Sequence, residues 1–328
     1  GIRMTAEWFP PKEVGTAEGI YGGWGNFGSA FSAFTMVLFG LALAFLPGAF
    51  QFADVQPFRV LLFPAFQTDI LNWRAAIAGS GIVGALYGIF YFFNVTDPLP
   101  GKVYQRPKRA RGMEVTSVRD FWFLMIMNLP LTIILMVLAW RLTKVNFLTM
   151  GGMYVAWVCL LGLYAFQAYN CWAVNKDLLS GAKVYPPEER YRFKQVAMLE
   201  LTYIVNFGSE LAVVTMLPAF FEGTFGLDKA TAGTIAASYA FMNLVSRPGG
   251  GLISDKMGSR KWTMVVLTAG MGIGYLMMST VSGSWPLPLA VLLTMACSFF
   301  VQSSEGATFA MVPLVKRKVT GQIGRAHV

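Results

Sequence analysis

The chain has 328 residues, of which 55% are hydrophobic and only 13% are charged. Soluble domains carry about 25% charged residues, so this composition excludes an ordinary soluble domain and indicates a helical protein embedded in a lipid bilayer. The net charge of +9 needs no nucleic-acid partner to explain it, because the basic residues lie in the connections between apolar runs.

Residues that usually hold cofactors are scarce. The single histidine is His327, and the cysteines Cys159, Cys171 and Cys297 all lie in apolar stretches. Haem and structural zinc are bound mainly by histidine and cysteine side chains. The sequence therefore predicts no cofactor, no metal site, no disulfide framework and no catalytic residue.

Apolar runs long enough to cross ~30 Å of hydrocarbon follow one another along the chain. Residues 1–9 are expected to end one helix, and residues 49–74 are expected to form a loop. The charged residues of that loop are Asp54, Arg59, Asp69 and Arg74. Eight complete spans are predicted, near residues 19–48, 75–93, 121–140, 151–172, 198–221, 231–251, 262–281 and 287–315. The expected fold is therefore all-α, a polytopic membrane bundle with about eight transmembrane helices.

The loops between the predicted spans differ in charge. Lysine and arginine are most frequent in loops on the cytoplasmic side of a membrane, so we assign the most basic connection to that side. Its basic residues are Lys102, Arg106, Lys108, Arg109 and Arg111. Counting spans from it places the other strongly basic loops on the same side, and the two spans at 121–172 form an insertion that enters and leaves there. The predicted location is the cytoplasmic membrane, crossed several times.

One apolar run carries a permanent cation. Arg247 is followed by Pro248 and three glycines, and placing an arginine inside a membrane costs ~2.5–3.5 kcal/mol on insertion scales. Such a residue is a functional candidate, because its planar fork matches planar oxyanions. The alternative is that Arg247, about two turns before a loop at ~1.5 Å per residue, extends to the lipid headgroups.

The loop after this run has a specific spacing. Gly251, Asp255, Gly258 and Arg260 stand in the pattern G-x-x-x-D-K-x-G-S-R-K, which resembles the signature loop of the major facilitator superfamily of transporters. The resemblance implies a conformational latch at these four residues. We expect Asp255 to act within that latch and not on a substrate.

Three further stretches resemble one family of that superfamily. They are GGWGNFG at 22–28, TYIVNFGSELAVV at 202–214 and FVQSSEGATFAMVP at 300–313. Together with Arg247 they resemble the nitrate/nitrite porters, in the version with an extra helical pair between the two halves. The resemblance places the family's nitrate signature and substrate-binding positions on Gly22, Gly25, Asn26, Gly28, Tyr203, Phe207 and Arg247.

The function that the resemblance implies is secondary active transport of nitrate and nitrite, by alternating access between two six-helix halves. The implied domains are the end of the first half at residues 1–95, loops and the inserted pair at 96–195, and the second half at 196–328. The chain is expected to be a fragment without the family's first and last helices, and a second substrate arginine belongs to the missing part. The final residues GRAHV are expected to be non-native.

The chemistry of nitrate fits the implied residues. A guanidinium can hold two oxygens of a flat anion in one plane, and the rings of Tyr203 and Phe207 can cover its faces. Glu210 and Glu305 are acids in apolar helices, so they are candidate proton carriers. Plainer alternatives are open: Phe207 as core, Glu210 as a solvated residue near the outer mouth, Glu305 as a helix-packing residue, and the glycines as a packing face.

Two other functions stay open. The chain could belong to a facilitator for another small anion, such as a monocarboxylate, or to a non-catalytic membrane subunit of a redox complex, which the scarcity of histidine disfavours. The expected partners are nitrate or nitrite, the lipid bilayer and protons as the coupling ion, with a monomer as the expected state. Proton symport and nitrate/nitrite exchange are both compatible with the sequence.

Overall fold

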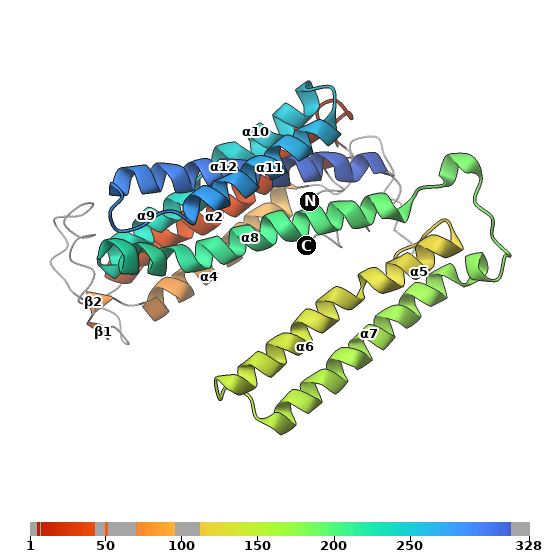
Figure 1. The fold of residues 1–328 in the computed structure, drawn as a ribbon, viewed down its shortest axis with the longest axis horizontal. Coiled ribbons are helices and arrows are strands. Elements are labelled where there is room, and N and C mark those ends of the chain that lie inside the picture. The colour runs from red at the N-terminus through yellow and green to blue at the C-terminus, as the bar shows by residue number, and fades with distance from the viewer. Residues whose placement is uncertain are drawn as a thin grey trace. The chain divides into compact units, whose positions relative to one another are not determined.

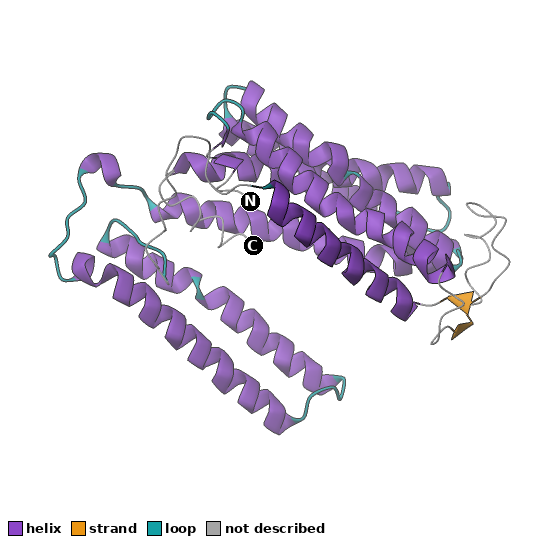
Figure 2. Cartoon of the chain, turned by 180° about the vertical axis from the view of Figure 1, so that it is seen from behind, coloured by secondary structure: helices purple, strands orange, loops and turns teal. Residues whose placement is uncertain are grey.

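The computed structural model describes residues 5, 6, 8–42, 50, 51, 70, 71, 73–95 and 112–315. Almost all of these residues are α-helical (Figures 1 and 2). The exception is a minimal ladder in which β1 (Phe50–Gln51) pairs antiparallel with β2 (Ile70–Leu71). The predicted all-α fold class is confirmed.

The contacts divide the chain into two compact units. The first joins Gly1–Tyr104 to Thr202–Leu314, and the second joins Gln105–Leu201 to Val315–Val328. The first unit contains α2 (Val14–Ala42), α4 (Trp73–Asn94), most of α8 (Phe193–Phe225), α9 (Lys229–Phe241), α10 (Asn243–Lys256), α11 (Arg260–Met278) and α12 (Leu287–Val315). Segments from both ends of the sequence therefore pack into one bundle.

Glycines allow α2, α10 and α12 to approach closely. A Cβ atom at Gly19 would lie 2.5 Å from the carbonyl oxygen of Arg247. On α10, a Cβ at Gly250 would overlap the carbonyl of Ser303 in α12, and one at Gly251 would overlap the carbonyl of Gly15 in α2. Small residues at such contacts are how membrane helices pack without a hydrophobic driving force. The glycines beside Pro248 thus place α10 tightly between two neighbours.

Most predicted spans match helices to within about seven residues at each end, but two are divided. The span predicted at 121–140 consists of α5 (Val118–Met127) and α6 (Leu129–Lys144), which are separated by Asn128. The span predicted at 231–251 consists of α9 and α10, which have 13 and 14 residues and meet at Met242. Neither is long enough to cross a bilayer alone. Arg74 was predicted to lie in a loop but is in the first turn of α4. The helix begins at Trp73, slightly before the apolar run on which the prediction was based.

The second unit is a helical hairpin. It contains α5 (Val118–Met127), α6 (Leu129–Lys144), α7 (Met150–Leu179) and the short 3-10 turn η2 (Pro187–Glu189). Trp157 of α7 donates its indole N–H to the carbonyl of Met136 at 2.9 Å. At the base of the hairpin, the buried Asn175 side chain accepts from the backbone N–H of Val115 and donates to the carbonyl of Met113, both at 2.9 Å.

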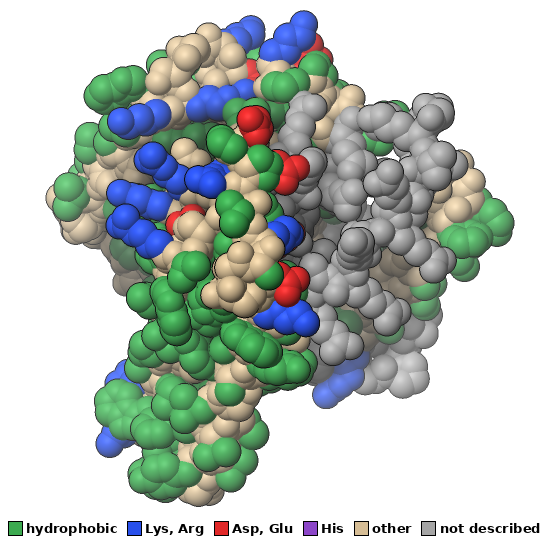
Figure 3. Space-filling model, turned by 90° about the vertical axis from the view of Figure 1, so that its right-hand side faces the viewer, with side chains coloured by type: hydrophobic (Ala, Val, Ile, Leu, Met, Phe, Trp, Pro, Cys, Tyr) green, Lys and Arg blue, Asp and Glu red, His purple; other side chains and the backbone are tan. Residues whose placement is uncertain are grey.

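The described helices expose large apolar side chains to their surroundings. Five of them are long and apolar enough to span a membrane, over Arg74–Asn94, Val118–Lys144, Met150–Leu179, Pro187–Phe225 and Leu287–Val315. Leu131 and Leu163 are 66% and 64% exposed, and Figure 3 shows hydrophobic side chains over much of the surface that faces the viewer. Such a surface is stable against lipid and not against water.

Several sequence-based expectations lie outside the described residues. These are the loop charges Asp54, Arg59 and Asp69, the basic cluster from Lys102 to Arg111, and the C-terminal residues 316–328 with His327.

Candidate functional site

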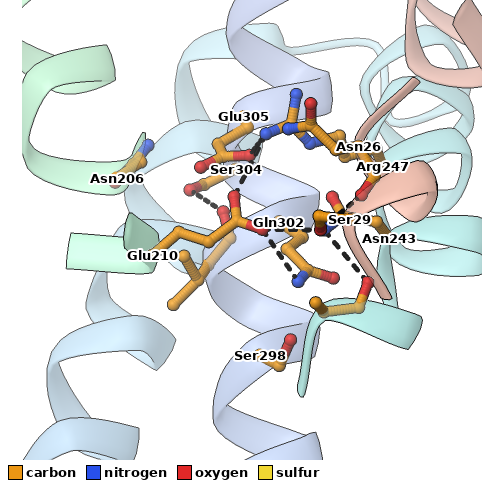
Figure 4. Close-up of polar contacts among 12 residues, drawn as sticks. Asn26, Ser29, Asn206, Glu210, Asn243, Arg247, Ser298, Gln302, Ser304 and Glu305 are labelled. Atoms are coloured by element: carbon orange, nitrogen blue, oxygen red, sulfur yellow. Dashed lines mark hydrogen bonds and ion pairs between the residues drawn. The ribbon is translucent and has the colours of Figure 1, made fainter. Parts of the chain in front are cut away.

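Four helices of the first unit bring polar side chains to one buried point. Three of them contribute an amide and a charged residue about one turn apart: Asn206 and Glu210 on α8, Asn243 and Arg247 on α10, and Gln302 and Glu305 on α12. Asn26 comes from α2. Residues three or four positions apart share a helix face, and Figure 4 shows Glu210, Arg247 and Glu305 converging with the amides of Asn243 and Gln302, while Asn206 lies to one side.

Arg247 is at the centre of this group and is 1% exposed. Its Nη2 lies 3.1 Å from the Oε2 of Glu210 and also forms an ion pair with the Oε2 of Glu305. The amide of Asn26 lies against the guanidinium; with its orientation assigned from these neighbours, its oxygen accepts from Nη1 at 3.1 Å and from Nη2. The alternative in which Arg247 extends to the lipid headgroups is therefore wrong.

Glu210 is held by three side chains. Its Oε1 accepts from the amide of Asn243 at 2.7 Å and from that of Gln302 at 3.2 Å, while its Oε2 faces Arg247. Glu210 is 4% exposed, so it is not a solvated residue at the mouth of the bundle. Three side chains therefore fix the position of the Glu210 carboxyl.

Glu305 is buried more deeply and held less firmly. It is fully buried, it pairs with Arg247, and its carboxyl lies close enough to that of Glu210 to interact with it. Neither of its oxygens accepts a hydrogen bond that meets the usual geometry. A buried carboxyl with few donors is the one more readily neutralised by a proton.

Aromatic rings flank the guanidinium. The Cζ of Arg247 lies 5.8 Å from the ring centre of Phe207 and 5.9 Å from that of Phe309. Tyr203 stacks on Phe207 with ring centres 5.1 Å apart at 16°. Rings within about 6 Å stabilise a cation through their negative faces. Phe207 therefore does more than fill a core.

The glycine signature divides in two. Gly22 faces the site, because a Cβ there would lie 3.3 Å from the ring of Phe309 and 3.4 Å from the Nη1 of Arg247. Gly25 and Gly28 face open space, with nothing within 4 Å of a Cβ at either position. The structure thus brings Gly22, Asn26, Tyr203, Phe207, Glu210, Arg247 and Glu305 together and leaves Gly25 and Gly28 away from the site.

Four residues of the group, Asn206, Asn243, Gln302 and Phe309, were missed in the sequence. Asn243 and Gln302 bind Glu210, and Phe309 covers the guanidinium. A signal was present for the three amides, because each is a polar residue in an otherwise apolar helix. Phe309 had none, since phenylalanines are abundant in every span.

The signature loop forms a second cluster at the N-terminus of α2. Asp255 accepts from the backbone N–H of Gly15 at 3.2 Å, from that of Thr16 at 2.7 Å and from the hydroxyl of Thr16 at 3.0 Å. A carboxylate there satisfies N–H groups that lack helical partners and interacts favourably with the helix dipole.

Arg260 completes this cluster. Its Nη2 binds Asp255 at 2.7 Å and the carbonyl of Pro11 at 3.0 Å, and its Nη1 reaches the carbonyl of Ala310 at 3.3 Å. Gly258 has φ of +67°, a conformation that favours glycine. The latch residues therefore lie together, joining α2 to α10, α11 and α12.

The buried guanidinium of Arg247 can bind a small anion. No group of three or more potential metal-ligating side chains lies together among the described residues. The guanidinium carries one positive charge and faces two carboxyls. An oxyanion that binds Arg247 must therefore take the place of a carboxyl, in a site walled by rings.

The sequence of this chain is similar to known membrane proteins. Residues 199–319 match the Major Facilitator Superfamily. The chain is 76% identical over 323 residues to the nitrate/nitrite transporter NrtP of a Picosynechococcus species and 50% identical over 325 residues to NrtP of Nostoc punctiforme, with 98% of the chain covered in both cases. It spans 60% and 61% of the lengths of these two relatives.

More distant similarity extends to plants. A high-affinity nitrate transporter 2.3 from Oryza sativa is 37% identical over 132 residues, which are 38% of this chain and 25% of that protein. No solved structure matches the chain. The relatives named here are transporters and not enzymes, and the chain is a multi-pass membrane protein.

Proposed function

Because the chain belongs to the nitrate/nitrite porter family of the major facilitator superfamily, we propose that it forms the anion site of a secondary transporter for nitrate and nitrite. The observation that carries the proposal is Arg247, a fully buried guanidinium with aromatic rings 5.8 and 5.9 Å away. Nitrate is flat and singly charged, so two of its oxygens can lie in the plane of the guanidinium fork, between rings that exclude water.

Proton coupling follows from the charges around Arg247. Among the described residues, one cation and two carboxylates meet at this point and give a net charge of −1, and an added nitrate makes the group more negative in a region of low dielectric, where uncompensated charge is costly. A proton on one carboxyl restores the balance and frees a place on the guanidinium. We therefore favour co-transport of nitrate with a proton over nitrate/nitrite exchange.

The proposed halves of the transporter meet at this site. Residues 1–95 are assigned to the first half, residues 196–328 to the second, and residues 96–195 to the inserted pair with its loops. Asn26 and Gly22 come from the first half, and Arg247, Glu210 and Glu305 from the second. Alternating access at such an interface moves one half against the other around a midplane site, with the Asp255–Arg260 cluster as a latch that must open and close.

The test is uptake of labelled nitrate by the full-length protein in a strain without its own nitrate transporter. Arg247→Lys keeps the charge but removes the fork, so uptake should fall by about 100-fold, because two charge-assisted hydrogen bonds of ~1.5–3 kcal/mol each are affected. Arg141→Lys, the same change at an exposed position of α6, is the matched control and should leave uptake unchanged.

Competition defines the substrate. Nitrite and chlorate should inhibit uptake of labelled nitrate, and a monocarboxylate should not. Normal uptake by Arg247→Lys would remove the site, and inhibition by the monocarboxylate alone would favour the other anion facilitator.

A further inference from the structure

Asn206 on α8 is a buried amide without partners. It is fully buried, and neither its Oδ1 nor its Nδ2 makes a hydrogen bond to any residue that the structure describes. In Figure 4 no dashed line reaches it, although it lies in the same polar group as Glu210 and Glu305. Buried polar groups are nearly always paired, and an unpaired one destabilises the fold. A group retained at such a cost needs a partner in another state of the protein.

The position of Asn206 limits what that partner can be. Ser209, three residues on, contacts Met271 of α11 at 3.7 Å, and Glu210, four residues on, contacts Arg247 of α10. Asn206 shares the face between these two directions. The neighbour there is α12, since Met271 packs on Val301, which is one turn before Glu305.

The two carboxyls at Arg247 differ in how easily they can leave it. Glu210 is also tied to Asn243 at 2.7 Å and to Gln302 at 3.2 Å. Glu305 has no comparable amide donor. An arriving anion therefore displaces Glu305 more readily than Glu210.

We propose that Asn206 receives the protonated side chain of Glu305 when the anion binds Arg247, so that Asn206 is a positioning residue for proton-coupled transport. The chemistry of the two groups is complementary. A protonated carboxyl has one donor and one acceptor, and a primary amide offers an acceptor and donors in the same plane. A carboxylate, which only accepts, would leave the Oδ1 of Asn206 unpaired. The inference rests on the proposed function, and the proton is taken up from water as an O–H bond forms on Glu305.

Other titratable groups around this cluster do not replace Glu305. Glu200 lies six residues before Asn206 on α8, ~9 Å along the helix axis, and Asp255 and Arg260 bind each other in the second cluster. The other buried or half-buried titratable side chains on these helices are Glu18 on α2, Tyr203 and Glu210 on α8, Tyr239 on α9, Arg247 on α10, Tyr275 on α11 and Cys297 on α12. Tyrosine and cysteine are neutral near pH 7, and arginine stays charged. Glu18 precedes Asn26 by two turns, ~12 Å along the helix axis, which leaves the two carboxyls at Arg247.

The experiment compares Asn206→Leu with Asn206→Gln in the full-length protein, measuring nitrate uptake against external pH. Loss of two hydrogen bonds to the protonated acid should lower the pH midpoint of uptake by about one unit, a tenfold loss of proton affinity. Asn206→Gln keeps the amide oxygen and the amide nitrogen, so its pH midpoint of uptake should lie closer to that of the wild type. An unchanged midpoint in Asn206→Leu overturns the inference, whereas a wild type that takes up no nitrate overturns the proposed function.

Thermal stability separates this role from a structural one. Asn206→Leu should melt at the same temperature as the wild type or higher, because it removes unpaired buried groups. Asn175→Leu is the matched control: Asn175 is 1% exposed but makes three hydrogen bonds, so the same change should lower the melting temperature. A parallel fall in both variants would mean that Asn206 is an ordinary structural amide.

Infrared difference spectroscopy gives a readout that does not depend on uptake. Adding nitrate should produce a protonated carboxyl band in the wild type that is absent in Glu305→Gln and shifted in Asn206→Leu. A band that persists in Glu305→Gln would place the proton on another residue and overturn the inference.

Discussion

At the scale of single residues, the centre of the protein is a guanidinium with more anionic partners than it can neutralise. Arg247 faces both Glu210 and Glu305, and all three are almost completely buried. Buried ion pairs add little stability, but removing one partner leaves an uncompensated charge. Under the proposed function, this group is where the transported anion takes the place of a carboxyl on Arg247.

Arg247→Leu tests this charge balance. The variant should lose about 3–5 kcal/mol of stability, because two buried carboxyls are left without their cation. Adding Glu305→Leu to it should recover part of the loss, since one of the two charges is then gone. Thermal unfolding of the detergent-solubilised protein measures both changes, with Arg141→Leu as the exposed control. If the second substitution lowered stability further, Glu305 would have an unrecognised favourable partner.

At the scale of elements, α10 is the helix on which the site depends. Its glycines allow it to lie between α2 and α12, which places Arg247 where side chains from three neighbours reach it. Ser303 donates from α12 to the carbonyl of Ser246 at 2.9 Å, and a close approach of this kind leaves no room for a side chain on the facing residue. The two faces of α10 therefore differ in what they tolerate.

Adjacent glycines of α10 provide a matched test. Gly250→Ala should destabilise the protein by about 1–3 kcal/mol, because the added methyl group overlaps the carbonyl of Ser303 and forces α10 and α12 apart. Gly249 has nothing within 4 Å of a Cβ atom, so Gly249→Ala should stabilise by about 0.5–1 kcal/mol through helix propensity. The measurement is the melting temperature of each variant relative to the wild type. Equal shifts for Gly250→Ala and Gly249→Ala would show that the close contact between α10 and α12 does not limit packing.

At the scale of the whole molecule, the latch and the anion site lie on the same helices. Asp255 and Arg260 hold the N-terminus of α2 through contacts of 2.7–3.2 Å, while Asn26 on the same helix contacts Arg247. Any motion of α2 against α10 must break contacts at both places. Under the proposed alternating access, the latch and the anion site would therefore change together, because both are carried by α2 and α10.

Asp255→Asn is expected to separate transport rate from binding. Removing the negative charge of Asp255 weakens its hydrogen bonds to Thr16 and Arg260. The maximal uptake rate should therefore fall by about tenfold, the effect expected for the loss of one charge-assisted hydrogen bond. Stabilisation of the protein against heat by added nitrate should be retained. Asp228→Asn is the control, because Asp228 caps α9 through the N–H of Thr231 and asparagine caps a helix equally well. A loss of nitrate-dependent stabilisation in Asp255→Asn would assign Asp255 to the anion site.

The sequence by itself determined the helices and the membrane. Runs of apolar residues have a length fixed by the bilayer, so α4, α7, α8, α11 and α12 lie close to where they were predicted. It also singled out Arg247, Glu210 and Glu305, because a charge inside an apolar run stands out wherever it occurs. The latch was recognisable for a related reason, since its glycines and charges are consecutive in the chain.

Only the tertiary structure decided which of these charges meet. Glu210 is 37 residues from Arg247 in sequence. An apolar run predicts a helix, but it does not predict which face of that helix packs against which neighbouring helix. That choice depends on how glycines let α2, α10 and α12 approach, and it brought in Asn243, Gln302 and Phe309 and left Gly25 and Gly28 outside. Local sequence fixes a helix because its hydrogen bonds are local, whereas a buried polar site is fixed by packing between distant segments.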